Sequence, residues 1–468
     1  MPDTFVSPLS SRYASDEMQR LLSPETRYAT WRRLWTSLAR AEHALGLPVT
    51  QSQVDELAAH ITDIDFDAVA EKERACRHDV MAHIYAYGLV CPNAAGIIHL
   101  GATSCFVTDN ADLILLRDAL KHIRGGMLAV MQNLSAFAER YKALPTVGYT
   151  HYQVAQPVTV GRRACLGMKD LALDLEELDD ALSAIRFLGC RGATGTEASF
   201  LELFSGDTEK IDALNRMIAA DFGFSDCYEL SGQTYPRKLD SRVLNALSSI
   251  AQSAYKFACD MRLLQHDGLL FEPFESEQVG SSAMAYKRNP MRSERVCSLA
   301  RFVMTTALNA PLTASAQWFE RTLDDSANRR LALPEAFLAC DAVLRLLFNI
   351  TGGLVVDEAA VARQLQNELP FIATENLLME AVRAGGDRQL CHERIRTHSM
   401  DCRASMRAGA PCDLIKRLAA DPAFPLDAAR MADVLDPMRY VGRSVEQTER
   451  FLAAHAVSDA PRAQELTL

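Results

Sequence analysis

Long, uninterrupted stretches of helical periodicity constrain this sequence more than any other feature. After a helix cap at Thr108 or Asp109, apolar residues recur every three or four positions as far as about Leu144. Similar stretches are predicted over 159–188, 239–266, 291–310 and 329–350. Helices of this length pack most simply side by side. The sequence therefore predicts an all-α chain built on a central bundle of long helices.

Shorter predicted helices lie on both sides of this bundle, and beyond Gly352-Gly353 the helices become short. The apolar stripes of the long helices are wide for one chain, so we expect helices of different subunits to pack together. Inside the first long helix, Gly125-Gly126 predicts a kink or a close helix contact. The expected domains are an N-terminal helical domain at 1–103, the central bundle at 104–356 and a small C-terminal helical domain at 357–468.

Loops rich in glycine and hydroxyl side chains separate the predicted helices. The least helical stretch, Gly280–Pro290, holds two serines and two adjacent cations between a helix end and a helix start. Such a loop suits anion binding or proton chemistry. A mobile, solvated loop with ordinary surface cations explains the same composition. Four other polar stretches have a similar composition: 77–83, 96–104, 148–156 and 317–330. The first of them is predicted to lie near the end of a helix at 66–82 or in a break of that helix.

Composition narrows the class of protein. The chain has 468 residues and a net charge of −11, which argues against a dedicated nucleic-acid binder, although a local basic cleft can still attract an anion. Twelve cysteines without a Cys-x-x-Cys pair suit reduced thiols in the cytoplasm. Neither a signal peptide nor a membrane span is predicted.

Candidate sites for a metal or a dinucleotide find little support. His78 and His83 are five positions apart, which on a helix points them about 140° apart and does not suit a zinc site. No P-loop and no Gly-x-Gly-x-x-Gly motif is present. We therefore expect no metal and no cofactor. Several side chains are nevertheless of the type that binds a phosphate or a dicarboxylate: Arg12, Thr103, Ser104, Arg321, Ser326 and Arg330.

The stretch Ser281-Ser282-Ala283-Met284-Ala285-Tyr286-Lys287-Arg288-Asn289-Pro290 resembles the signature loop of the fumarase/aspartase superfamily. Within it, the chain resembles the animal-type adenylosuccinate lyases from about Ser7 to Phe451. Ala285 stands where the signature usually has proline, which implies a looser loop. Five further matches are Ser11-Arg12-Tyr13, Arg77–His83, His99–Ser104, Thr150-His151 and Gln317–Arg330.

The resemblance implies β-elimination of fumarate by general acid–base catalysis, with no cofactor. Ser281 is the implied base, His151 the acid for the leaving nitrogen, and Lys287 a stabilising cation. His78 contacts the substrate and orients its phosphate or His151, while Glu294 orients a histidine. The implied substrate-binding residues are Asn289 with Lys287 for one carboxylate, Thr103 and Ser104 for the other, and Arg12, Tyr13, Thr150, Gln233, Arg295, Arg321, Ser326 and Arg330 for the remainder.

The resemblance also implies the substrates and the assembly. The family cleaves adenylosuccinate to AMP and succinylaminoimidazole-carboxamide ribotide (SAICAR) to AICAR, in a cytoplasmic homotetramer whose sites each draw on three chains. No nucleic acid and no membrane is expected as a partner. Two alternatives stay open: another fumarate-releasing lyase such as argininosuccinate lyase, fumarase or aspartase, or a catalytically silent helical scaffold. The Arg12-Tyr13 pair and the Arg321–Arg330 segment favour a nucleotide substrate over a small dicarboxylate.

Overall fold

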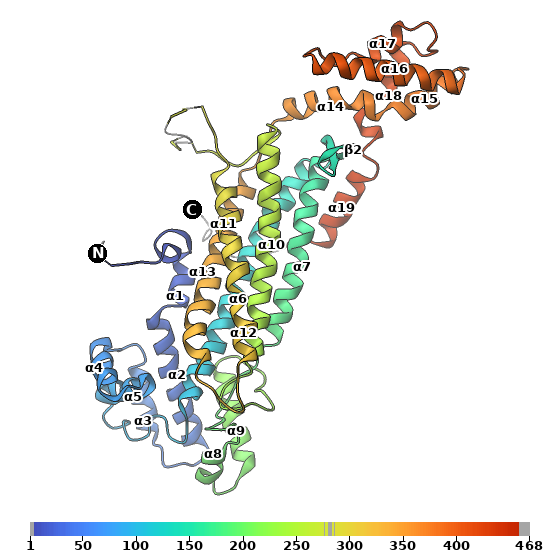
Figure 1. The fold of residues 1–468 in the computed structure, drawn as a ribbon. Helices are drawn as coiled ribbons and strands as arrows, with labels where there is room; N and C mark the ends of the chain where they lie inside the picture. Colours follow the sequence, from blue (N-terminus) through green and yellow to red (C-terminus); the bar gives the residue numbers. More distant parts are fainter. Residues whose placement is uncertain (1–3, 276, 279–282, 285, 458–468) are drawn as a thin grey trace.

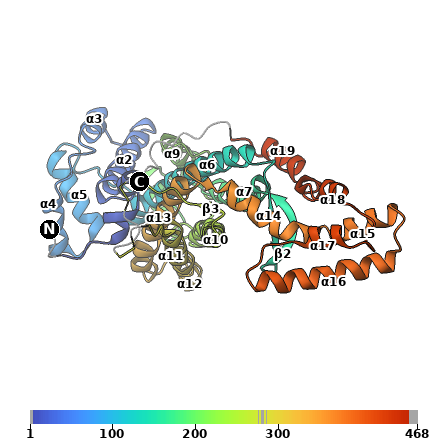
Figure 2. The same ribbon diagram turned by 90° about the horizontal axis from the view of Figure 1, so that it is seen from above.

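The computed structural model describes residues 4–275, 277–278, 283–284 and 286–457. Five long helices lie side by side and run alternately up and down the molecule (Figures 1 and 2). They bury a continuous apolar cluster that also includes residues of the N-terminal helices. The predicted all-α bundle is therefore confirmed. The five helices are α6 (Ser104–Arg140), α7 (Val160–Ser183), α10 (Lys238–His266), α11 (Met291–Thr306) and α13 (Asp325–Gly352).

Smaller elements cover the two ends of this bundle. At one end, below the bundle in Figure 1, lie most of the N-terminal helices and two short helices of the 184–237 segment. Of the latter, α8 was not predicted, because that segment reads as irregular. The N-terminal helices are η1 (Leu9–Tyr13), α1 (Asp16–Leu21), α2 (Pro24–Ala44), α3 (Gln51–Ala59), α4 (Phe66–Cys76) and α5 (Asp79–Val90). The two helices of the 184–237 segment are α8 (Ala198–Leu203) and α9 (Thr208–Asp221), and a further short helix, α12 (Asn309–Ser315), follows α11.

One predicted alternative was confirmed, and one predicted helix start was misplaced. Of the two places predicted for the 77–83 stretch, near the end of the 66–82 helix or in a break, the structure shows a break, since Arg77 adopts a left-handed conformation at φ 55° and His78 caps a new helix, α5. The longest helix begins at Ser104, with Thr103 as its extended N-cap residue, and not after Thr108. Both breaks place a predicted site residue at the first turn of a helix, where free backbone N–H groups gather.

The stretch predicted as a loop at 148–156 is instead part of an antiparallel hairpin. Strand β1 (Pro145–Thr150) pairs with β2 (Gln153–Thr159), with a bulge between Thr146 and Gly148. A Cβ atom at Gly148 would lie 2.3 Å from the carbonyl oxygen of Gln156, so only glycine fits there. Gly148 and Pro157 therefore belong to the strands and do not interrupt them.

The glycine pair in α6 allows a close approach between two helices. Both glycines lie inside one continuous helix. A Cβ atom at Gly126 would lie 3.2 Å from Cδ1 of Leu344 on α13. Of the two predicted outcomes, a kink or a close contact, the structure shows the contact.

The C-terminal helices form a second apolar cluster, set apart from the bundle at the upper right of Figure 1. The chain then returns, because α19 (Ser444–Ala454) lies along α7, where Arg162 donates to Gln447 at 2.7 Å. The domain boundaries at 103/104 and 356/357 stay predictions. The other elements are β3 (Leu270–Phe271), β4 (Val355–Val356), α14 (Glu358–Ile372), α15 (Thr374–Arg383), α16 (Arg388–Arg407), α17 (Leu414–Ala420), α18 (Ala428–Val434), which was not predicted, and η2 (Pro437–Arg439).

Over the residues that the structure describes, no helix combines the length and the apolar character needed to cross a membrane.

One buried carboxyl group on α2 makes a prediction about stability. Glu42 is fully buried, neither of its side-chain oxygens has a hydrogen-bond partner in the described part of the chain, and burial raises its pKa to about 8. An unfolded chain releases this proton near pH 4.3. The folded state retains it, so Glu42 costs the fold stability progressively as the pH rises from about 4.5 to about 8.

Replacing Glu42 with glutamine should remove this pH dependence. Between pH 5.5 and pH 8, the free energy of unfolding of the wild type should fall relative to that of Glu42→Gln by about 3 kcal/mol. Urea unfolding at several pH values, at one protein concentration, measures this difference. Glu25→Gln, an exposed change on the same helix, is the matched control and should run parallel to the wild type. Parallel curves for Glu42→Gln as well would contradict the prediction.

Candidate active site

Several predicted site residues meet where α5 and α6 begin. His78 Nε2 lies 3.4 Å from the hydroxyl oxygen of Ser104, and His78 Nδ1 accepts a hydrogen bond from the backbone N–H of Met81 at 3.3 Å. Because a backbone N–H can only donate, Nδ1 carries no proton in this arrangement. A neutral His78 therefore has its proton on Nε2, which faces Ser104. Thr103 precedes Ser104 as the N-cap residue of α6.

His99 lies close to His78. It belongs to the matched stretch His99–Ser104, but from the sequence it was assigned no role in the active site. The indole N–H of Trp35 donates to His99 Nδ1 at 2.9 Å, so the proton of this ring also sits on Nε2. Burial, with a smaller contribution from His78, lowers the pKa of His99 to about 4. Its backbone adopts a left-handed conformation at φ 70°. A neutral histidine in a strained loop conformation beside His78 is a signal of function that only the structure supplies.

The segment predicted at 317–330 reaches this same end of the bundle. Gln233 accepts a hydrogen bond from the thiol of Cys105 at 3.5 Å, and its backbone N–H donates to Glu320 at 3.0 Å. Arg330 pairs with Asp79 at 2.9 Å, which joins the second turn of α13 to the first turn of α5. Ser326 lies in the first turn of α13. The structure thus brings together His78, Thr103, Ser104, Gln233, Arg321, Ser326 and Arg330, which we call the basal cluster.

A buried chain of ion pairs fixes Arg321 in the basal cluster. Its Nη1 atom lies 2.9 Å from one oxygen of Asp325, and Nε of Arg237 lies 2.7 Å from the other oxygen. Arg237 also pairs with Asp109 of α6 at 2.8 Å. Although burial disfavours its charge, the Asp109 carboxylate raises the pKa of Arg237. The orientation of Arg321 is therefore set by α6 and α10 as well as by its own helix.

A second buried arginine network lies beside the first. Arg329 donates to Asp240 at 2.7 Å, to Asp112 at 3.0 Å and to the hydroxyl of Tyr235. Arg27 of α2 pairs with Asp112 at 2.6 Å. Burial alone would raise the pKa of Asp112, but Arg27 and Arg329 lower it overall. This network ties α2, α6, α10 and α13 together behind the basal cluster.

Another group of predicted residues lies beside η1. The guanidinium carbon of Arg295 lies 5.7 Å from the centre of the Tyr13 ring, a cation–π distance. Arg345 of α13 donates to the backbone oxygen of Tyr13 at 2.8 Å. Arg12, the neighbouring residue, is exposed. This group joins the N-terminal segment to the first turns of α11.

The signature loop is described only in part. Ser281 and Ala285 lie outside the described residues. Lys287 is exposed, and its backbone N–H donates to Met284 at 3.0 Å. Asn289 is half-buried and accepts at its backbone oxygen from Met291 at 2.8 Å, while Glu294 is exposed on the first turn of α11.

His151 stands at the tip of the hairpin, where the sequence had suggested a loop. Thr150 and Gln153 are the last paired residues, so His151 and Tyr152 form the turn. Both have positive φ, 51° and 57°. Two-residue hairpin turns of this kind prefer asparagine and glycine, and bulky residues there are strained. The turn thus presents an exposed imidazole at the tip of the hairpin.

The structure therefore separates His151 from the basal cluster. Ser104 begins α6, and the hairpin begins at Pro145, just after α6 ends at Arg140. A helix of 37 residues is about 55 Å long. Figure 1 shows the hairpin at the upper end of the bundle, opposite the lower end where the basal cluster lies. One nucleotide-sized molecule cannot touch both groups within a single chain.

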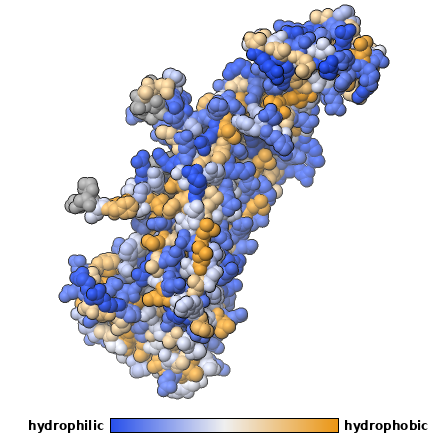
Figure 3. Space-filling model, in the orientation of Figure 1, coloured by the Kyte–Doolittle hydropathy of each residue, from blue (hydrophilic) through white to orange (hydrophobic). Residues whose placement is uncertain are grey.

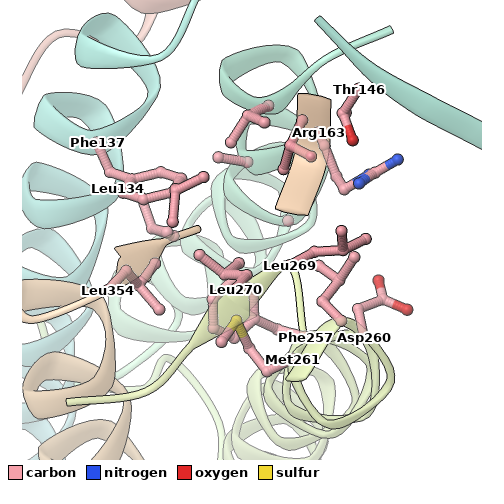
Figure 4. A pocket seen from close by; sticks show the side chains of 16 residues that line it. Leu134, Phe137, Thr146, Arg163, Phe257, Asp260, Met261, Leu269, Leu270 and Leu354 are labelled. Carbon is pink, nitrogen blue, oxygen red and sulfur yellow. The ribbon is translucent and has the colours of Figure 1, made fainter. Parts of the chain in front are cut away.

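A separate cavity behind the hairpin holds none of the predicted residues. It measures about 50 Å³ and is mostly apolar (Figure 4). Burial lowers the pKa of Arg163 and raises that of Asp260, two of the three labelled polar side chains on its wall. Its size and apolar lining suit a packing defect between the hairpin and the bundle. The labelled wall residues are Leu134, Phe137, Thr146, Arg163, Phe257, Asp260, Met261, Leu269, Leu270 and Leu354.

Comparison with known proteins decides the family. The chain is 49% identical over 453 residues to the adenylosuccinate lyase of Schizosaccharomyces pombe, a match that covers 96% of this chain and 94% of that protein. The chain belongs to the adenylosuccinate lyase family. The adenylosuccinate lyase of Saccharomyces cerevisiae is likewise 49% identical, over 454 residues and the same shares of both chains. Membership makes the chain a lyase and confirms the resemblance to the fumarase/aspartase superfamily.

Family models agree with this assignment, and a solved structure shares the fold. Residues 50–305 match the model described as "Lyase", and residues 370–451 match "Adenylosuccinate lyase C-terminus". The 3-carboxy-cis,cis-muconate lactonizing enzyme of Pseudomonas putida superposes with a TM-score of 0.81 at 24% identity, over 97% of this chain and 99% of that one. At that identity the likeness concerns the fold alone. Within the described residues, no three His, Cys, Asp or Glu side chains form a group that could hold a metal ion.

Proposed function

We propose that the chain cleaves adenylosuccinate to AMP and fumarate, and SAICAR to AICAR and fumarate, within purine nucleotide biosynthesis. The observation that carries the proposal is the 49% identity to curated adenylosuccinate lyases over nearly the whole of both chains. The chemistry is a β-elimination that breaks a carbon–nitrogen bond. It requires a base for the proton on carbon, an acid for the leaving nitrogen, and fixed positive charge for the carbanion-like intermediate.

In this proposal Ser281 is the base and His151 is the acid. The Ser281 alkoxide removes the proton next to a succinyl carboxylate, the carbon–nitrogen bond breaks, and the leaving nitrogen takes a proton from His151. Lys287 and Asn289 hold the carboxylate on which charge develops. Glu294, one turn into α11, orients a histidine of the site. An exposed imidazole at the hairpin tip is free to enter a site made by other chains.

The basal cluster is the proposed place for the rest of the substrate. His78, with its Nε2 proton toward Ser104, is positioned to donate a hydrogen bond to an anionic group. Thr103 and Ser104 hold the second carboxylate at the free N–H groups of α6. The cations Arg321 and Arg330, with Ser326 and Gln233, take phosphate and ribose. Arg12, Tyr13, Thr150 and Arg295 complete the proposed contacts.

A homotetramer with shared sites is the proposed assembly. Support comes from the length of α6, which keeps His151 and the basal cluster apart in one chain. Large apolar side chains also stand exposed on α11–α13, among them Leu308, Leu312 and Leu331. Figure 3 shows apolar residues along the exposed face of the bundle. Packing these helices against other copies would bury that surface and bring distant groups together.

A cytoplasmic location is proposed on the chemistry of the thiols. The twelve cysteines are all free, and most are buried. Burial raises the pKa of the Cys105 thiol, next to the basal cluster, to about 12, which keeps it protonated and unreactive at neutral pH. Such thiols suit a reducing compartment.

A substrate panel tests the proposed function. The purified protein is incubated separately with adenylosuccinate, SAICAR, argininosuccinate, malate and aspartate, and products are followed by ultraviolet absorbance and chromatography. We expect AMP and fumarate in equal amounts from adenylosuccinate, AICAR and fumarate from SAICAR, and no turnover of the other three compounds. Preferred cleavage of argininosuccinate would point to a different lyase of the superfamily. Turnover of none of them would support a silent scaffold.

A further inference from the structure

A single buried carboxylate holds the first turn of α11. Glu272 follows strand β3 and is 5% exposed. Its Oε1 atom accepts a hydrogen bond from the backbone N–H of Arg292 at 3.0 Å. Its Oε2 atom accepts from the backbone N–H and from the hydroxyl of Ser293, both at 2.9 Å. Three donors from two adjacent residues thus converge on one side chain.

These bonds replace a cap that the local sequence does not provide. Helix α11 begins at Met291, and its N-cap residue, Pro290, makes no side-chain cap bond. The first N–H groups of a helix have no partner inside the helix. Glu272 satisfies two of them from about 20 residues upstream, and a carboxylate at a helix N-terminus is favoured by the helix dipole.

Two further contacts join the start and the end of the same segment. Gln265, in the last turn of α10, accepts from the backbone N–H of Glu272 at 3.2 Å and donates to the backbone oxygen of Arg288 at 3.1 Å. The guanidinium group of Arg292 donates to the backbone oxygen of Pro273. The chain is therefore tied to itself across residues 272–273 and 288–293.

This tie lies beside a cleft of about 600 Å³. Its wall includes Glu272, Gln265, Arg288 and Asn289, together with the start of α14 at Glu358. Asn289 is one of the residues proposed to hold a carboxylate of the substrate. The buried hydrogen bonds of Glu272 thus lie next to a proposed substrate-binding group.

We propose that Glu272 is a positioning residue for the elimination reaction, acting through the first turn of α11 on Lys287, Asn289, Glu294 and Arg295. The inference rests on the proposed function. All four residues lie within five positions of Arg292 along the chain, Lys287 and Asn289 before it and Glu294 and Arg295 after it. Loss of the carboxylate leaves the N–H groups that it holds unpaired and frees the turn to shift. A displacement of about 1 Å in such a group can lower a rate about 100-fold.

The test compares Glu272→Ala and Glu272→Gln with a control, Glu275→Gln. Glu275 pairs with the side chain of the same arginine, Arg292, but is 69% exposed. We expect Glu272→Ala to lower kcat for adenylosuccinate about 10- to 100-fold with little change in KM. Glu272→Gln, which keeps one acceptor oxygen, should lose less, and the control should match the wild type. Chromatographic size and circular dichroism should be the same for all four proteins.

Two measurements separate positioning from a general loss of structure. In a Lys287→Ala background, which already lacks one of the positioned groups, the added effect of Glu272→Gln should be smaller than in the wild type. Hydrogen exchange of the amides at Arg292 and Ser293 should speed up in Glu272→Ala and Glu272→Gln but not in Glu275→Gln.

Three outcomes would overturn the inference: kcat within threefold of the wild type in Glu272→Ala, strict additivity with Lys287→Ala, or unchanged exchange at these amides. Should Glu272→Ala fail to assemble, Glu272→Gln decides by the same criteria. A wild type that cleaves none of the proposed substrates would refute the proposed function instead, and the exchange measurement would still decide whether Glu272 holds the turn.

Discussion

Replacing Arg329 with methionine should lower the free energy of unfolding by about 3–5 kcal/mol. The arginine is 9% exposed and joins Asp112 of α6 to Asp240 of α10. Methionine fills much of the same space but offers no donor, so both buried carboxylates lose a cation. Removing one partner from a buried network leaves uncompensated charge, which costs far more than breaking an exposed pair.

The matched control is Arg330→Met, one residue further along α13. The Arg330 side chain is 66% exposed and makes one pair, with Asp79. We expect its loss to change stability by about 1 kcal/mol or less. Urea unfolding of wild type and both variants at one protein concentration measures the difference. Equal effects of the two substitutions would show that the buried network does not stabilise the fold.

The effect of Arg329→Met should also depend on pH. Arg27 and Arg329 together lower the pKa of Asp112 below its usual value. A carboxylate with a lowered pKa stabilises the fold above its unfolded pKa, and this contribution is lost as the pH falls through the folded value. The gap between wild type and Arg329→Met should therefore be widest near neutral pH and should narrow below about pH 4.

Mixing two inactive variants should restore activity, if sites are shared between subunits as proposed. Alone, His151→Ala lacks the proposed acid and Ser281→Ala the proposed base, and each should lose at least about 100-fold in kcat. In mixed assemblies some sites draw His151 from one chain and Ser281 from another. With random exchange of subunits, roughly a quarter of the sites would hold both wild-type residues.

The mixing experiment needs two controls. Each variant is taken through the same dissociation and reassociation alone, and exchange is confirmed by native mass spectrometry with one variant carrying a tag. We expect activity of the mixture well above the sum of the separate variants. Confirmed exchange without recovery would contradict shared sites, and near-normal turnover by Ser281→Ala alone would contradict its role as the base.

The sequence predicted the architecture well because long helices leave a strong periodic signal. Its main error concerns the hairpin, where Gly148 and Pro157 looked like breakers of regular structure. In the fold, Gly148 is needed because the opposite strand passes too close for a side chain. The start of α6 was predicted too late. Its N-cap residue, Thr103, has an extended backbone but makes no side-chain cap hydrogen bond.

The site was only partly predictable, for a geometric reason. Motifs identified residue types, and the structure does bring His78, Ser104 and Arg321 to one end of the bundle. The distance between that end and His151 follows from the length of α6, which no motif reveals. Glu272 and His99 were missed because each acts through partners that are distant in the sequence. Glu272 accepts from the N–H groups at the start of α11, and His99 accepts from the indole of Trp35.

The return of the chain to the bundle at α19 has a consequence for synthesis. This helix covers α7, with Phe451 and Leu452 against the main apolar cluster, yet about 260 residues separate the end of α7 from its start. At about 5–20 residues per second, the covering helix emerges from the ribosome roughly 13–50 s after α7. Throughout that interval the strip of α7 lacks the helix that covers it in the finished fold, so its apolar residues stay exposed on the nascent chain.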